Sequence, residues 1–339
     1  KGIYKMKKKY LSVIFVLLTS FSFAQWIWQN PLPQGNQLRS TYFISDNIGY
    51  AVGDFGTILK TMNGGQTWSS LTSGTNHYLM AVCFVNTNIG YIVGLHGTIL
   101  KTIDGGVTWT KKESGTTDEL FSVYFTDENT GYAVGGMNEL RGTILKTIDG
   151  GDTWSVSIGV SVNSLWSVCF TSASIGYAVG QYGTILKTTD AGSMWNQLPF
   201  TNNDFLNSVC FTGDNIGYMV GNYGIVYKTV DSGLTWSSYY GGSNHSLRSV
   251  YFTNSNSGYA VGYGGYILKT NNAGQTWISI TSNTNGNLNS VWITNNNNVI
   301  AVGETGTIIK TSDEGTTWNN LRTGTTTILN SIFFVNPLI

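Results

Sequence analysis

Apolar side chains occur in short runs along this chain, and each run is bounded by glycine, asparagine or aspartate. One stretch contains Leu79–Phe84 ("LMAVCF"), Gly90–Gly94 ("GYIVG") and Gly97–Thr102 ("GTILKT"), followed by a segment that ends at Trp109. The runs are rich in β-branched and aromatic residues and are separated by turn-forming residues, which is typical of β-strands. Because no amphipathic helical period follows residue 25, we expect an all-β fold.

The same pattern recurs along the chain, and each copy ends with a tryptophan: Trp68, Trp109, Trp154, Trp195, Trp236, Trp277 and Trp318. Successive tryptophans are 41 residues apart, except for an interval of 45 between Trp109 and Trp154, where the loop Gly136–Arg141 contains the extra residues. A period of this size with four strands per unit predicts the blades of a β-propeller. A lone blade would expose both apolar faces, so we expect the blades to pack radially with the tryptophans between neighbours.

The segment before each tryptophan has the form Thr-x-Asp-x-Gly-x-Thr-Trp, as in "TIDGGVTW" (Thr102–Trp109). It resembles the Asp-box of BNR-repeat propellers, and its Asp position is occupied by Asn63, Asp104, Asp149, Asp190, Asp231, Asn272 and Asp313. Together with the G-Y-x-V-G and G-T-I-L-K-T strands, the unit resembles secreted bacterial propellers similar to the photosystem II stability and assembly factor. The resemblance implies a propeller with seven complete four-stranded Asp-box blades and a partial repeat.

We expect these repeated motifs to be structural. Asparagine at Asn63 and Asn272 can cap a turn, but an amide is a poor substitute for a carboxylate in a metal site. The Asp or Asn side chain is expected to accept backbone N–H groups within the turn, while glycine supplies positive φ. The three histidines, His77, His96 and His245, lack a third ligand at a metal-binding spacing. The sequence therefore predicts no metal and no cofactor.

The first 24 residues precede the repeats and have the features of a secretory signal peptide. A basic segment at Lys7–Lys9 is followed by an apolar run, and Ser22-Phe23-Ala24 fits a cleavage site. We expect cleavage after Ala24, which gives a protein that is secreted or held at the cell surface. The apolar run is short for a bilayer span, so no membrane span is expected in the mature chain.

The remaining residues, 25–339, are expected to form a single propeller domain. Residues 28–38 resemble the outer strand of a blade, and residues 329–339 begin like the inner strand of an eighth unit. We therefore expect the natural protein to continue beyond residue 339. Seven and eight blades both stay open as alternatives, because seven complete units can close alone or with a composite eighth blade.

Charge excludes one class of partner. The whole chain has 18 basic and 18 acidic residues, and removing residues 1–24 leaves 13 basic residues, which gives a net charge of about −5. Nucleic-acid binding needs a basic surface, so we expect no nucleic-acid partner. We expect the mature protein to be a monomer.

The candidate site lies in the loops on one face, which we call the top face. It is the face reached by the loops between the second and third strands of each blade and by the loops between blades. Units four to six carry large side chains there: Trp166, Tyr182, Tyr223, Arg248 and Tyr263. Aromatic rings with an arginine suit a protein, peptide or glycan partner, although surface aromatics are also common in a tyrosine-rich chain. We expect a non-catalytic binding scaffold.

A glycoside hydrolase is the alternative, because Asp-boxes also occur in sialidase-like and xyloglucanase-like propellers. Such an enzyme needs two carboxylates beside a shared cleft. Asp54 and Glu304 occupy the same loop position in units one and seven, and a seven-bladed ring would make these units neighbours. The sialidase version needs three converging arginines, whereas the arginines here are spread over different units.

Overall fold

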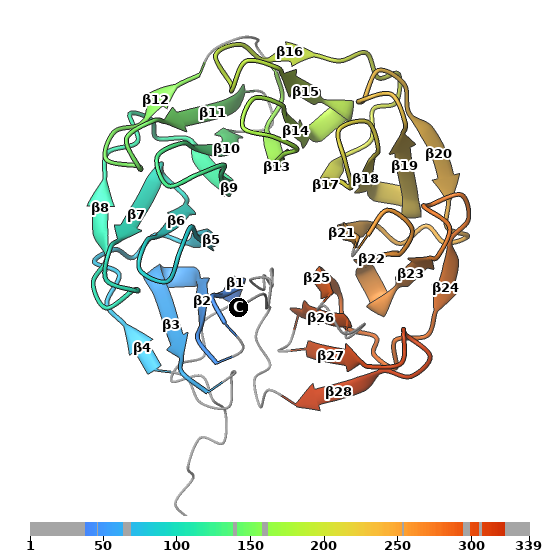
Figure 1. The fold of residues 1–339 in the computed structure, drawn as a ribbon. Helices are drawn as coiled ribbons and strands as arrows, with labels where there is room; N and C mark the ends of the chain where they lie inside the picture. The colour runs from blue at the N-terminus through green and yellow to red at the C-terminus, as the bar shows by residue number, and fades with distance from the viewer. Residues whose placement is uncertain are drawn as a thin grey trace, which may run out of the picture.

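The computed structural model describes residues 38–45, 47–63, 69–137, 141–157, 162–252, 254–293, 299–304 and 307–322. They form seven four-stranded antiparallel sheets, and in each sheet the strands follow one another in sequence order. The sheets are arranged as blades around a central axis (Figure 1). The predicted all-β propeller is therefore confirmed. The proposed signal peptide, residues 28–37 of the strand-like segment and the eighth inner strand at 329–339 lie outside the described residues.

The blades share one plan, in which the first strand is innermost and the fourth lies at the rim (Figure 1). The first strands are β1 (Leu38–Phe43), β5 (Leu79–Phe84), β9 (Glu119–Phe125), β13 (Leu165–Phe170), β17 (Leu206–Phe211), β21 (Leu247–Phe252) and β25 (Leu288–Ile293). The second strands are β2 (Gly49–Gly53), β6 (Gly90–Gly94), β10 (Gly131–Met137), β14 (Gly176–Gly180), β18 (Gly217–Gly221), β22 (Gly258–Gly262) and β26 (Val299–Gly303).

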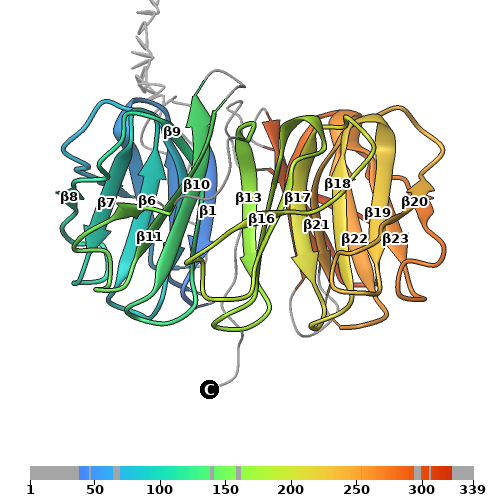
Figure 2. The same ribbon diagram turned by 90° about the horizontal axis from the view of Figure 1, so that it is seen from above.

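The outer strands complete the blades. The third strands are β3 (Thr57–Thr61), β7 (Thr98–Thr102), β11 (Arg141–Thr147), β15 (Ile185–Thr188), β19 (Ile225–Thr229), β23 (Ile267–Thr270) and β27 (Thr307–Thr311). The fourth strands are β4 (Ser69–Leu71), β8 (Thr110–Lys112), β12 (Ser155–Val156), β16 (Asn196–Gln197), β20 (Ser237–Tyr240), β24 (Ile278–Ile280) and β28 (Asn319–Arg322). In Figure 2 the innermost strands β13 and β17 point down and β10 points up, which places the loops after the second strands on the upper, top face.

The four extra residues of the third unit lengthen a hairpin, which differs from the expected longer loop. Strands β10 and β11 each have seven residues, and Met137 pairs with Arg141 at the end of the ladder. Residues 138–140 lie outside the described chain. The extension arises because the added residues continue the antiparallel pairing in register.

Aromatic residues fill the interfaces between blades. Tyr50 of blade one stacks on Phe84 of blade two with ring centroids 4.4 Å apart, and Trp109 meets Phe84 edge-on at 5.9 Å. Gly90 opens strand β6 beside this cluster, where an added Cβ would lie 2.5 Å from the Phe84 ring. The same trio recurs at the following interfaces, as Tyr91/Phe125/Trp154, Tyr132/Phe170/Trp195, Tyr177/Phe211/Trp236 and Tyr218/Phe252/Trp277.

A second set of contacts fixes the Asp-boxes of blades two to seven to the preceding blade. The Tyr50 hydroxyl donates to the carbonyl of Gly105, the residue after Asp104, and Lys60 Nζ donates to the same oxygen at 2.7 Å. We call this arrangement the inter-blade clamp. Tyrosines at four further interfaces donate to the equivalent carbonyl: Tyr91 to Gly150, Tyr132 to Ala191, Tyr177 to Ser232 and Tyr218 to Ala273. Lys187, Lys228 and Lys269 donate likewise, to Ser232, Ala273 and Glu314.

The ring has one junction that differs from the others. Neighbouring inner strands pack against each other along the series from β1 to β25, and within the described residues no comparable set of contacts joins β25 back to β1. The first and seventh blades face each other across this junction at the lower side of Figure 1. The tyrosine position of the second strand is occupied by Ile300 in β26, so blade seven lacks the tyrosine of the clamp. The described residues thus account for seven blades.

Candidate functional site

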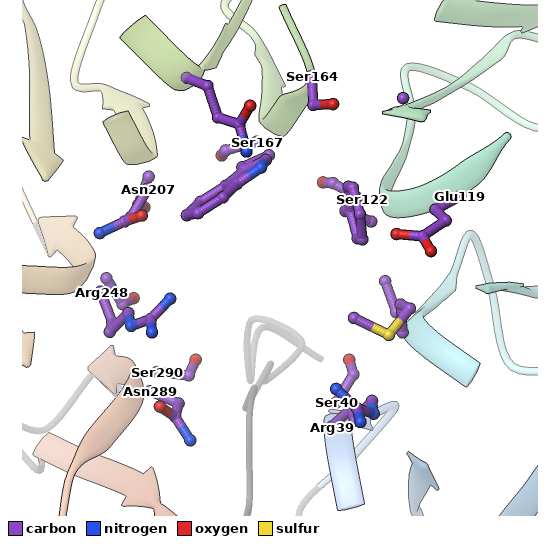
Figure 3. Close-up of a pocket in the computed structure, with 18 of the residues that line it drawn as sticks. Arg39, Ser40, Glu119, Ser122, Ser164, Ser167, Asn207, Arg248, Asn289 and Ser290 are labelled. Carbon is purple, nitrogen blue, oxygen red and sulfur yellow. The ribbon is translucent and has the colours of Figure 1, made fainter. Parts of the chain in front are cut away.

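A cavity of about 710 Å³ lies where the innermost strands approach the top face. Counted from the leucine that recurs in each of the seven inner strands, the second residue lines the cavity in every blade: Arg39, Met80, Phe121, Trp166, Asn207, Arg248 and Asn289. Figure 3 shows the labelled members of this set around a shared space, together with serines of the third position. One variable residue from every blade therefore faces the same cavity, although each comes from a different repeat.

The chemistry of these second residues divides the cavity wall into two arcs. Blades two, three and four contribute Met80, Phe121 and Trp166, which form an apolar arc. Blades five, six, seven and one contribute Asn207, Arg248, Asn289 and Arg39, which form a polar arc. A ligand held here can bury apolar groups on one side and form hydrogen bonds on the other. This combination is typical of binding pockets.

The serines at the third position have a structural role. The hydroxyl of Ser40 accepts a hydrogen bond from the backbone N–H of Val82 in the next blade at 3.2 Å. Ser167, Ser208 and Ser249 accept from Val209, Val250 and Val291 in the same way, at 3.4, 3.4 and 3.3 Å. These contacts join neighbouring inner strands just inside the cavity. They explain why serine recurs at this position.

The two arginines of the polar arc are held in place by their neighbours. Arg39 forms an ion pair with Asp54, and its guanidinium carbon lies 5.0 Å from the centroid of the Tyr78 ring. Arg248 donates to the Tyr263 hydroxyl, and its guanidinium carbon lies 4.6 Å from the Tyr263 ring centroid.

Burial lowers the pKa of Arg248, and the carboxylate of Glu304 opposes that shift. An arginine keeps its charge despite such a shift because its ordinary pKa is far above neutrality. The cavity therefore holds a preorganised cation in its polar arc.

Aromatic rings extend the apolar arc onto the top face. Trp166 stacks on Phe205 with centroids 5.9 Å apart, and Tyr182 lies 5.0 Å from Phe205. Of the five residues predicted from the sequence, Trp166 and Arg248 line the cavity, while Tyr182 and Tyr263 are joined to it through Phe205 and Arg248. Tyr223 projects from the neighbouring loop with 58% of its surface exposed.

Phe205 was not among the predicted site residues. It precedes strand β17 in a loop between blades, and Tyr78 has the same relation to β5 beside Arg39. These loops have the same length in every unit, as from Trp68 to Leu79 and from Trp195 to Leu206, but the residue before the leucine differs in type from unit to unit. An aromatic residue directly before an inner strand was the available signal.

The loops after the second strands hold large side chains in a strained backbone. Phe55, His96, Tyr182 and Tyr223 have φ of 54°, 56°, 52° and 62°, and the equivalent residue in blade six is Gly264 with φ of 65°. A left-handed conformation costs a residue with a Cβ about 1–2 kcal/mol, and glycine would avoid that cost. Phe55 and Tyr182 are nevertheless 59% and 44% exposed. Strain of this kind is common at binding sites.

The Asp-boxes lie away from the cavity, in the turns between third and fourth strands. Asp104 accepts hydrogen bonds from the Thr108 backbone N–H at 2.9 Å, the Thr108 hydroxyl at 2.6 Å and the Thr102 hydroxyl at 2.8 Å. The bonds from Thr108 are the main cause that lowers the pKa of Asp104 to about 2.

The same carboxylate-to-threonine bonds are made by Asp149, Asp231 and Asp313. At Asp190 the backbone N–H of Met194 is the donor. Asn272 closes its turn with an amide, since its Oδ1 accepts from the Thr276 N–H and its Nδ2 donates to the Thr276 hydroxyl. Thr61 donates to Asn63, and residues 64–68 of that box, including Trp68, lie outside the described chain.

The two carboxylates of the hydrolase alternative have different surroundings. Glu304 lines the cavity and accepts a hydrogen bond from Asn287 at 2.8 Å. Asp54 is buried and is engaged by Arg39 instead of lining the cavity. Among the described residues no group of three His, Cys, Asp or Glu side chains is placed to hold a metal ion. The same part of the chain has no helix that is long and apolar enough to cross a membrane.

The sequence model of the family described as photosynthesis system II assembly factor YCF48 matches residues 20–111, 67–155, 114–238 and 199–335. The chain belongs to this family. The resemblance seen in the repeat is therefore confirmed. No curated protein matches the chain.

Two solved structures of this family and one of a GH74 enzyme have the same fold. "YCF48 bound to D1 peptide" superposes with a TM-score of 0.69 at 20% identity, covering 82% of this chain and 92% of the other. YCF48 from Cyanidioschyzon merolae gives a TM-score of 0.68 at 19% identity, covering 83% and 97%. A Niastella koreensis GH74 enzyme gives 0.61 at 16% identity, covering 90% and 69%. At these identities the likeness concerns the fold alone.

Proposed function

We propose that this family member is an exported, non-catalytic scaffold that binds an extended peptide segment of a partner protein at the mouth of the top-face cavity. The observation that carries the proposal is the division of the cavity wall into an apolar arc and a polar arc. One solved structure in the family is of YCF48 bound to D1 peptide, which supports a peptide as the ligand class.

The contacts of the site indicate how such a segment is held. Apolar side chains of the peptide pack against Met80, Phe121 and Trp166, and the Trp166–Phe205 stack presents a rigid surface toward Tyr182. Peptide carbonyls accept hydrogen bonds from Arg248 and from the amides of the polar arc. Large aromatic side chains bury much area with little loss of side-chain entropy, which makes them frequent energetic centres of interfaces.

The surroundings of the carboxylates favour binding over hydrolysis. Acid–base hydrolysis of a glycoside needs two carboxylates on either side of the scissile bond. Asp54 is ion-paired with Arg39. The carboxylates that line the cavity are Glu304 of blade seven and Glu119 of blade three, which are not neighbouring blades. A glycan is the second candidate ligand because rings and amides also suit sugars.

Export is part of the proposal and rests on the sequence of residues 1–24. The basic segment, the apolar run and the Ser-Phe-Ala site are all present. A secreted or surface location places the partner outside the cytoplasm.

Tyr182 and Tyr223 of the top face allow a test that distinguishes a binding role from a structural one. Peptide and glycan arrays probed with the full chain identify a ligand, and its affinity is then compared for Tyr182→Ala plus Tyr223→Ala and for the control Asn271→Ala. Asn271 is an exposed Asp-box residue of blade six on the opposite face. We expect the double variant to bind about 30-fold more weakly, which corresponds to roughly 2 kcal/mol. Equal affinities would contradict the site, and hydrolysis of an array glycan that is lost in Glu304→Gln would favour the hydrolase.

A further inference from the structure

The face opposite the cavity carries apolar side chains that the Asp-box turns do not require. Ile103 and Val107 of blade two and Ile148 of blade three are 70%, 68% and 71% exposed. The position of Ile103 and Ile148 is occupied by Thr189, Asn271 and Ser312 in blades four, six and seven, where the turn has the same hydrogen bonds. The repeats thus serve as an internal control, and they show that the fold itself does not need apolar residues at these tips.

The two turns belong to one continuous surface. Tyr91 of blade two donates to the Gly150 carbonyl in the turn of blade three at 2.5 Å, and Lys101 bonds Asp152 of that turn at 3.0 Å. On the same face Asn86 of blade two donates to Glu128 of blade three at 2.7 Å. Figure 1 shows sheets β5–β8 and β9–β12 side by side. These inter-blade contacts therefore fix the position of the blade-three turn relative to blade two.

Exposed carboxylates lie in these Asp-box turns and in the turn between β9 and β10, and Asp152 among them is paired with Lys101 and Lys112. Asp104, Asp127, Glu128 and Asp149 are exposed, and none of them is ion-paired to a basic residue within the described chain. Hydrogen bonds from threonine and backbone N–H groups lower the pKa of Asp104 and Asp149, so these two groups are charged at neutral pH. A partner that covers the apolar side chains must also compensate this negative charge.

We propose that the Asp-box face of blades two and three is a docking surface for a basic, amphipathic polypeptide segment of a partner. Apolar side chains of the segment pack on Ile103, Val107 and Ile148, and its lysines or arginines lie against the four carboxylates. An anionic lipid surface would be repelled by the same charges. This surface is separate from the top-face cavity and does not depend on the function proposed for it.

The test uses labelled synthetic helices as probes, one made of leucine and lysine and one of leucine and glutamate. The full chain is compared with a variant carrying Ile103→Ser, Val107→Thr and Ile148→Ser. The serines and the threonine match Ser312 and Thr316 of blade seven, so the turns are expected to fold. The control carries Val230→Ser and Leu234→Thr, which remove a similar exposed apolar pair from blade five.

The Leu/Lys helix should bind the full chain and the blade-five control equally, and bind the blade-two and blade-three variant at least roughly tenfold more weakly. Raising the salt concentration should weaken binding, and the Leu/Glu helix should not bind. Equal affinity for all three proteins, equal binding of the two helices or no binding of the Leu/Lys helix would overturn the proposal. If the full chain sedimented with phosphatidylglycerol vesicles and the triple variant did not, the proposed polypeptide partner would be wrong and a membrane surface would be favoured.

Discussion

The Tyr91 hydroxyl of blade two donates a hydrogen bond to the Gly150 carbonyl of blade three at 2.5 Å. Gly150 follows Asp149, the central residue of an Asp-box whose side chain closes its own turn. The box therefore has two structural consequences: it shapes the turn, and it presents a carbonyl to the preceding blade. The boxes of blades two to seven thereby form a series of joints between successive blades.

The clamp predicts unequal effects for two chemically identical substitutions. In Tyr50→Phe the Gly105 carbonyl keeps its bond from Lys60, whereas in Tyr91→Phe the Gly150 carbonyl loses its donor because Lys101 is engaged by Asp152. Losing a bond costs about 0.5–1.5 kcal/mol, and leaving a buried acceptor unsatisfied costs about 1–3 kcal/mol. Urea unfolding should show the larger loss for Tyr91→Phe. An equal loss of unfolding free energy in both variants would contradict the finding that Tyr50 and Lys60 share the Gly105 carbonyl as acceptor.

Acid should weaken the Asp-box turns. Hydrogen bonds lower the pKa of Asp104, Asp231 and Asp313 to about 2 from an ordinary value of 3.8. Between these values the unfolded chain binds more protons than the folded one, so stability is fully present above about pH 4 and decreases as the pH falls toward 2. Replacing all three residues by Asn should reduce this pH dependence, as measured by urea midpoints at pH 6 and pH 3. An unchanged dependence would show that other groups cause it.

The tryptophans between blades should be the most sensitive positions to truncation. Trp195 is almost completely buried and packs edge-on against Phe170 at 5.9 Å and Tyr132 at 6.4 Å. Trp195→Ala removes the largest side chain of this interface and should cost about 3–5 kcal/mol. Calorimetry or urea unfolding measures the loss. A cost below that of Tyr91→Phe would contradict the role of the aromatic cluster.

The proposed export predicts the first residue of the mature protein. When the gene is expressed with its leader in a host that has a secretory pathway, the exported protein should begin at Gln25, because Ser22-Phe23-Ala24 forms the cleavage site. N-terminal sequencing of the exported fraction measures this. A mature chain that retains Met6 would contradict cleavage.

The fold could be predicted almost completely from the sequence because the repeat fixes it. The period of the tryptophans, the alternation of apolar residues and the glycine-bounded strands each have one consistent structural solution. The second residues of the inner strands could also be read from the repeat, which is how Trp166 and Arg248 were found. The repeat pattern could not predict contacts between residues that occupy different positions of the repeat.

Phe205 is one example, because it meets Trp166 and Tyr182 from a loop whose length is the same in every unit but whose residue type at this position varies. The hairpin extension at Met137 and Arg141 is another, since four inserted residues can form either a loop or more ladder. The ion pair of Arg39 with Asp54 is a third. It joins strand β1 to the turn that follows β2 in the same blade, and it changes the expected role of Asp54 from a candidate acid to a counter-ion.

The most direct test of the account is the affinity of a selected peptide for the full chain and for Trp166→Ala. Trp166 is the largest side chain of the apolar arc, and it is not a member of the Tyr–Phe–Trp clusters between the blades. The account predicts that Trp166→Ala keeps the circular dichroism spectrum and the unfolding midpoint and binds the peptide about 30-fold more weakly, as expected for the loss of a central aromatic contact. An unchanged dissociation constant in a folded Trp166→Ala protein would contradict binding at the cavity.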